Sequence, residues 1–413
     1  MSLTAKVLTV LLIALVVGIV GAKAALRRKA TAPDIAAAAS GHGQHHEATS
    51  SAIDWTRVTD RDLDVADLFV TARTEGIGPA LTKLERHAAG DTVMRDMGHV
   101  IAHALGRFIV GRRDGDPAVY AECREVFQAG CNHGVMEAYF ASARAATPDA
   151  VAPRALDSLC DRITRPGAAR LVSLECAHGM GHGLIVRYRG DVRGALAACD
   201  HLTDADARRE CHDGVFMENA VRATSSADMR VGTAAVEAGA AARQQPPLAR
   251  RGDPSSPCNG IDERYRDACW TYQPIIALEE AAGDQRKLIV VCEEAPPAFR
   301  DDCFFGIGKQ ATGWWQDERR VAGLCESIAA PGDSACVAGA ADSYLDEMWT
   351  GDRAMIFCGA VAAARKDACY ETVGSRLALM RTDAAPMARE CARAEGDFAR
   401  SCLRGVERAR TPR

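Results

Sequence analysis

The chain has 413 residues, which fits two or three ordinary domains or one long repeat array. Aromatic residues make up only 5% of the chain, a composition that favours packed helices over strands. The formal net charge is −5 and no basic stripe with interleaved aromatic residues occurs, so we expect no nucleic-acid partner.

The first 24 residues have the layout of an export signal. A short basic start precedes an apolar run at 7–21, and residues 22–24 read Ala-Lys-Ala, similar to a signal cleavage site. The segment also suits an uncleaved membrane anchor, because Lys23 can extend a run that is slightly short for a bilayer. We expect an exported protein, periplasmic or extracellular, that is either secreted or tethered. Membrane contact is expected only through residues 1–24.

Residues 25–52 have the composition of a flexible tether, rich in Ala, Ser, Thr and Gly. His42, His45 and His46 lie in its middle. They suit a metal-loading arm of low affinity and equally suit a plain polar tether.

Sixteen cysteines fall into eight consecutive pairs. The last five pairs each enclose ten residues and begin 33 or 34 residues apart, which indicates a repeat protein. The even count predicts that each repeat carries its own disulfide. Paired cysteines persist only in an oxidising compartment, which favours export. The predicted disulfides are Cys123–Cys131, Cys160–Cys176, Cys199–Cys211, Cys258–Cys269, Cys292–Cys303, Cys325–Cys336, Cys358–Cys369 and Cys391–Cys402.

The pattern within one repeat predicts an αα-hairpin. In the unit 317–345, a helical stretch at 318–327 precedes a Pro-Gly-Asp turn signal at 331–333, and a second helical stretch begins at Cys336. A disulfide from Cys325 to Cys336 would join the two helices beside their turn. The expected fold is all-α and solenoid-like. It resembles tetratricopeptide and Sel1-like arrays in architecture only, because their consensus residues do not occur here.

Histidine use divides the body of the chain. We expect histidine-bearing repeats at 53–243, a linker rich in proline and arginine at 244–257, and histidine-free repeats with Cys-x10-Cys spacing at 258–413. A hairpin near 78–110 has no cysteine, and Met97 stands where its second cysteine would be.

Donor side chains recur when the second helices are aligned on their cysteines or on Met97. The second residue after that position is His99, His133, His178 and Asp213 in turn, and the sixth is His103, Glu137, His182 and Met217. Residues four apart share a helix face, and equivalent helices of a solenoid pack side by side. The alignment predicts a transition-metal site with the ligands His99, His103, His133, Glu137, His178 and His182. His212 and Asp213 would complete this site or support its ligands.

A purely structural role for these histidines is the alternative. Against it, we expect no donors at the two positions in the later helices, which begin at Cys269, Cys303, Cys336, Cys369 and Cys402. Imidazole and carboxylate ligands suit Zn, Fe, Mn or Cu. Nearby methionines favour copper, although methionine on a helix more often packs in a core. They are Met97, Met136, Met180 and Met217.

The spacing disfavours a zincin-type peptidase, because Val100 and Gly179 replace its general-base glutamate. Three functions then compete. The first is metal binding, with the ion either catalytic or only handled. The second is a scaffold for an envelope protein partner, contacted through aromatic residues at 270–272 and 314–315. The third is an enzyme that uses the histidines as acid and base without metal.

Overall fold

The structure is a computed structural model that describes residues 60–224, 245–250, 252–281, 284–315 and 317–410. The predicted signal or anchor and the tether with His42, His45 and His46 lie outside the described residues. Every regular element of the described residues is helical, which confirms the expected all-α fold. Within these residues, no helix has both the length and the apolar composition that crossing a bilayer requires.

Each repeat is a hairpin with a short first part and a longer second helix, called here the B helix. The B helices are α5 (Gly98–Arg112), α6 (Gly130–Ala141), α9 (Arg170–Arg187), α11 (Ala205–Thr224), α13 (Arg266–Glu280), α15 (Arg300–Trp314), α17 (Gly332–Met348), α19 (Ala363–Met380) and α21 (Ala399–Arg410). The other α-helices are α2 (Asp60–Thr74), α3 (Ile77–Gly90), α4 (Thr92–Asp96), α7 (Pro153–Asp157), α8 (Leu159–Ile163), α10 (Val192–Cys199), α14 (Gln285–Glu293), α16 (Glu318–Glu326), α18 (Asp352–Ala360) and α20 (Ala384–Cys391). Short 3-10 turns include η1 (Pro117–Glu122), η5 (Cys258–Gly260) and η6 (Glu263–Tyr265).

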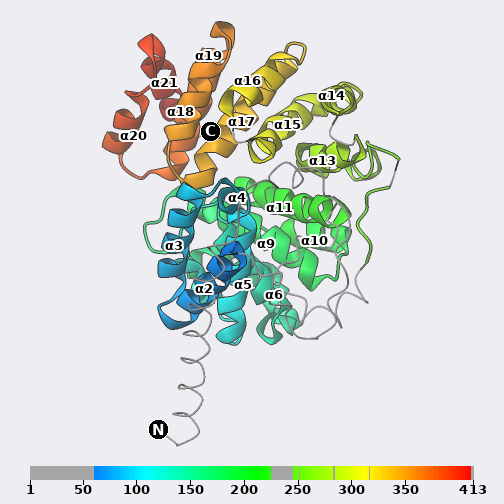
Figure 1. Ribbon diagram of the computed structural model, residues 1–413. Coiled ribbons are helices and arrows are strands. Elements are labelled where there is room, and N and C mark those ends of the chain that lie inside the picture. The colour runs from blue at the N-terminus through cyan, green and yellow to red at the C-terminus, as the bar shows by residue number, and fades with distance from the viewer. Residues whose placement is uncertain (1–59, 225–244, 251, 282–283, 316, 411–413) are drawn as a thin grey trace, which may run out of the picture. The chain divides into compact units, whose positions relative to one another are not determined.

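Each B helix packs against the B helix of the next repeat, from α5 to α21. Figure 1 shows the later hairpins, α13 to α21, following one another in chain order. Glycine permits the close approach between α9 and α11. A Cβ added at Gly214 would lie 1.9 Å from the backbone oxygen of His178, and one at Gly181 would lie 2.2 Å from that of Cys211. A glycine inside a helix lowers helix stability by about 1 kcal/mol relative to alanine. The close backbone contact between α9 and α11 compensates for this loss.

Eight disulfides join the consecutive cysteines as predicted, with Cα–Cα distances of 5.4–5.8 Å. These distances lie within the normal range for disulfides. In the repeat of α16 and α17, Cys325 lies near the end of the first helix and Cys336 near the start of the second. Each disulfide therefore ties a hairpin together beside its turn. Eight such bonds are typical of a protein that matures in an oxidising compartment.

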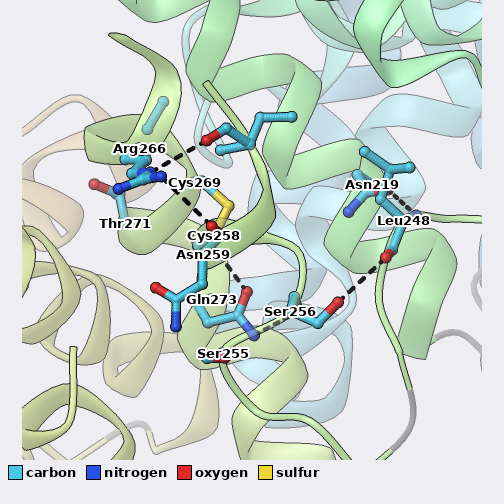
Figure 2. Close-up of a disulfide and its surroundings, with 12 residues drawn as sticks. Asn219, Leu248, Ser255, Ser256, Cys258, Asn259, Arg266, Cys269, Thr271 and Gln273 are labelled. Carbon is cyan, nitrogen blue, oxygen red and sulfur yellow. Dashed lines mark hydrogen bonds between the residues drawn. A yellow bond between two sulfur atoms is a disulfide. The ribbon is translucent and has the colours of Figure 1, made fainter. Parts of the chain in front are cut away.

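The segment 244–257, expected to be a linker, is hydrogen bonded to the helices on both sides in its described part. The backbone N–H of Leu248 donates to Asn219 Oδ1 on α11 at 3.0 Å, and Gln273 Nε2 on α13 donates to the Ser256 carbonyl at 3.0 Å. Figure 2 shows these residues around the disulfide of α13. Because α11 also packs directly on α13, the row of B helices continues past this segment.

Repeats far apart in sequence also meet. α19 packs against α9. The turn before α6 reaches the end of α17, where the backbone N–H of Phe127 donates to the Glu347 carbonyl at 2.5 Å and that of Gln128 donates to the Asp346 carbonyl at 3.1 Å. Side chains of the late repeats thereby lie beside those of the histidine-bearing repeats.

Candidate metal centre

Five imidazoles from three successive B helices form one cluster. Its members are His99 and His103 on α5, His133 on α6, and His178 and His182 on α9. The ring centroid of His133 lies 5.0–5.8 Å from the ring centroids of the other four. The structure thus brings together all five histidines that the alignment singles out.

The cluster follows from helix geometry and close helix packing. His99 and His103 are four residues apart on one helix face, and their ring centroids are 4.6 Å apart. Glycine lets α6 approach α5 at the same level, since a Cβ at Gly134 would lie 2.0 Å from the His103 carbonyl oxygen. The short distance between α5 and α6 therefore brings the side chains at the aligned positions into contact.

One nitrogen of each imidazole faces a protein oxygen. In four cases the oxygen belongs to a glutamate of the following B helix. These contacts are His103 Nδ1 to Glu137 Oε1 at 3.1 Å, His133 Nε2 to Glu175 Oε2 at 3.3 Å, His178 Nδ1 to Glu210 Oε2 at 3.6 Å and His182 Nδ1 to Glu218 Oε2 at 3.2 Å. In the fifth case, His99 Nδ1 lies 2.8 Å from the Phe127 carbonyl oxygen. A contact of this kind with an ionised carboxylate or a carbonyl oxygen places a proton on one nitrogen and leaves a lone pair on the other.

Three of the opposite nitrogens are buried and have no hydrogen-bond partner. They are Nε2 of His103, Nδ1 of His133 and Nε2 of His182. An unpaired buried polar group costs about 1–3 kcal/mol, so three on adjoining rings require an explanation. An imidazole whose N–H is held by a carboxylate and whose other nitrogen is free is the form in which histidine binds a metal.

Burial also keeps His178, His133 and His103 neutral. It lowers the pKa of His178 to about 4, and the neighbouring Glu210 opposes this shift only in part. Burial and then the adjacent His178 hold the pKa of His133 well below its usual range. Burial likewise lowers the pKa of His103. Neutral rings at neutral pH leave their nitrogens available as ligands.

Donor atoms within 4.8 Å of one another form three overlapping groups. The groups are His99, His103 and His133; His133, His178 and His182; and Glu137, His182 and Glu218. Donors bound tetrahedrally at about 2.1 Å from a metal are about 3.4 Å apart. A modest contraction of either histidine group would therefore give the spacing of a metal site.

The two further predicted residues differ in position. His212 Nε2 pairs with Asp200 Oδ1 at 3.1 Å, and its ring packs edge-on against Tyr265. Asp213 lies among other charges, and burial followed by repulsion from Glu210 raises its pKa well above the usual range. The structure therefore does not bring His212 into the cluster, and it places Asp213 near the glutamate that faces His178.

A second group of buried charges adjoins the histidines. Arg376 on α19 lies 3.3 Å from Glu175 Oε1, 3.1 Å from Asp342 Oδ1 and 2.5 Å from Asp346 Oδ2. Lys309 Nζ lies 3.1 Å from Asp342 Oδ2. Glu175 thus contacts both His133 and Arg376, and burial followed by repulsion from Asp346 raises its pKa to about 8.

The expectation that the later helices carry no donors at the aligned positions was wrong. Asp342 is the sixth residue after Cys336, and Glu371 is the second residue after Cys369. The pattern of histidines does not reveal these carboxylates. Nor does it reveal the supporting glutamates, although Glu175 directly precedes an alignment cysteine. Aligning all charged residues would have found Asp342, whereas the glutamate contacts needed the fold.

The aromatic residues suggested as contacts for a protein partner are partly core residues. Trp270 and Tyr272 are 1% and 2% exposed, so they do not present a surface. Trp314 and Trp315 are partly buried, and Arg320 lies over the ring of Trp315.

Comparisons of the chain with protein-family models, with curated proteins and with solved structures find no match. The functional conclusion therefore rests on the chemistry of the cluster.

Proposed function

We propose that this protein is an exported helical repeat protein that binds a transition metal ion through imidazole nitrogens of its histidine-bearing repeats. The observation that carries the proposal is the set of three buried, unpaired nitrogens on His103, His133 and His182. A bound metal ion would give such nitrogens a partner, and each of them belongs to a residue of a candidate donor group. Neither packing nor acid–base catalysis accounts for three lone pairs buried in one imidazole cluster without a proton donor.

The ligands follow from which nitrogen of each ring is already engaged. His103 and His182 would bind through Nε2 and His133 through Nδ1. His99 would bind through Nε2, because its Nδ1 faces the Phe127 carbonyl. His178 lies beside His133 and His182 and completes the set.

Glu137 is assigned a different role from the one expected from its place in the alignment. One of its oxygens faces His103 Nδ1 at 3.1 Å, and the other accepts from Arg107 at 2.5 Å. Because both oxygens are engaged, we infer that Glu137 orients His103 and stays outside the ligand set. Glu175, Glu210 and Glu218 would orient their histidines in the same way.

Charge supports a cation in this region. The largely buried carboxylates around the cluster and its neighbouring charges are Glu137, Glu175, Glu210, Asp213, Glu218, Asp342 and Asp346, and the cations facing them are Arg107, Lys309 and Arg376. Acidic groups outnumber cations here, and burial favours the neutral forms of Glu175 and Asp213 by raising their pKa values. A bound cation would offset the charge of the carboxylates that stay ionised.

The ligand set narrows the choice of metal. Imidazole nitrogens suit Zn, Cu, Fe and Ni, whereas Mn prefers carboxylate and water oxygens. The expected candidates Zn, Cu and Fe thus fit better than Mn.

Metal analysis of the oxidised protein, purified from the cell envelope, tests the proposal. We expect stoichiometric metal in the wild type and its loss in the double variant His103→Ala, His182→Ala. His212→Ala is the matched control, because His212 is 7% exposed but pairs with Asp200 outside the cluster. A wild-type protein that takes up none of Zn, Cu, Fe or Mn, or a folded double variant with undiminished metal, would refute it.

A further inference from the structure

The histidine-free repeats reach the cluster through two routes, and the first passes through Arg376. This guanidinium lies on α19 in the late repeats, and its side chain is 10% exposed. It is held within those repeats by Asp346 at 2.5 Å and by Asp342 at 3.1 Å. It then reaches across to Glu175 on α9, whose other oxygen lies 3.3 Å from His133 Nε2.

The second route passes through the turn Phe127–Ala129, which precedes α6. Phe127, Gln128 and Ala129 have φ values of 55°, 52° and 53°, so three consecutive non-glycine residues are left-handed. A backbone of this kind persists only where its surroundings hold it. Here the surroundings include the end of α17, which accepts from the backbone N–H groups of Phe127 and Gln128.

The side chain of Gln128 adds a further bond to the same helix, since its Nε2 donates to Ser343 Oγ at 3.1 Å. On the opposite side of the turn, the Phe127 carbonyl oxygen lies 2.8 Å from His99 Nδ1. The late repeats therefore fix the position of the Phe127 carbonyl group, which orients His99.

We propose that the histidine-free repeats set the metal affinity of the cluster, with Arg376 positioning His133 through Glu175, and with α17 positioning His99 through the turn Phe127–Ala129. This inference rests on the proposed metal-binding function. Groups that orient metal ligands typically change metal affinity by 10–100-fold when they are removed. The late repeats thus act on the ion without supplying a ligand.

Thermodynamic linkage adds a consequence. If contacts between the late and early repeats strengthen metal binding, metal binding must strengthen those contacts by the same factor. Removing the metal should therefore loosen the turn Phe127–Ala129 and the packing of α19 on α9.

The test uses cobalt(II) as the probe on the full oxidised chain, with affinity measured by chelator competition and geometry by the visible absorption of the bound ion. We expect Arg376→Gln to lower the affinity 10–100-fold and to change the spectrum, and Arg376→Lys to restore part of both. Gln128→Ala should lower the affinity several-fold. Arg365→Gln is the control, because Arg365 pairs with Asp333 at 2.6 Å within the late repeats.

The outcomes separate this inference from the proposed function. A wild type that binds no cobalt overturns both. A wild type that binds cobalt, alongside folded Arg376→Gln and Gln128→Ala proteins with unchanged affinity and spectrum, overturns only the role of the late repeats. If circular dichroism shows that Arg376→Gln does not fold, then Arg376→Lys and Gln128→Ala decide by the same criterion.

Discussion

Glu175 Oε2 lies 3.3 Å from His133 Nε2, although the two residues are 42 positions apart and belong to different repeats. The same relationship recurs at His103, His178 and His182, each of which faces a glutamate of the next B helix. The cluster is therefore assembled by neighbouring repeats jointly, since each repeat supplies imidazoles and the next supplies the groups that orient them.

Metal should stabilise the fold. A ligand that binds only the folded state adds about 4 kcal/mol when its free concentration is a thousand times its dissociation constant. We expect the midpoint of denaturant unfolding to rise on addition of the metal found in the native protein and to fall with a chelator. Identical unfolding curves for both samples would contradict this.

Replacing one histidine that has an unpaired ring nitrogen separates the effect on metal binding from the effect on folding. His103→Leu removes the unpaired Nε2 and leaves Glu137 paired with Arg107. The metal-free variant should therefore remain within about 1 kcal/mol of wild-type stability, while stabilisation by metal disappears. Denaturant unfolding with and without metal measures both quantities.

His212→Leu serves as the control for this change. Asp200 keeps the Tyr265 hydroxyl at 2.7 Å and Arg264 at 3.2 Å after the substitution. This variant should retain the full stabilisation by metal. Loss of that stabilisation here would mean that any buried histidine affects the site.

Acid should weaken the contribution of His178 to the stability of the metal-free protein. The folded-state pKa of His178 is about 4, lowered by burial, against about 6.5 in an unfolded chain. Between these values the unfolded state binds a proton that the folded state excludes, so stability is fully present above pH 6.5 and declines as the pH falls to 4. Each shifted unit corresponds to about 1.4 kcal/mol.

The measurement is the free energy of unfolding of chelator-treated protein at several pH values. A His178→Leu variant should show a shallower decline below pH 6.5. A His178→Leu variant whose stability follows the same pH dependence as the wild type would argue against a buried, neutral His178.

The glycine contact between α9 and α11 gives a paired prediction. In Gly214→Ala the new Cβ would meet the His178 carbonyl oxygen at 1.9 Å, so α11 must move away from α9. We expect a loss of about 1–3 kcal/mol in stability, together with weaker metal binding, because Glu210 and Glu218 move with α11.

The matching change is Gly323→Ala on α16, where an added Cβ meets nothing within 4 Å. It should raise stability by up to about 1 kcal/mol, because alanine is the better helix former. Equal effects of the two substitutions on unfolding would contradict a specific role for the glycine contact.

The sequence by itself determined the hairpins, the pairing of their cysteines and the histidine-bearing faces. These features depend on short-range periodicity: Cys325 and Cys336 close one turn, and His99 and His103 share a face because four residues make about one helical turn. The same periodicity explains why His212 lies outside the cluster. His212 follows its alignment cysteine by one residue instead of two, and a shift of one residue rotates a side chain by about 100° around the helix.

Only the tertiary structure decided which groups support the imidazoles and what the late repeats contact. Arg376 and Glu175 are 201 residues apart, and the turn Phe127–Ala129 meets Asp346 and Glu347 across a similar separation. These long-range contacts depend on the total rotation along the row of B helices, to which each pair of successive repeats adds a small angle. The spacing of residues within one repeat does not determine this total rotation, because the packing of each pair of helices sets its own angle.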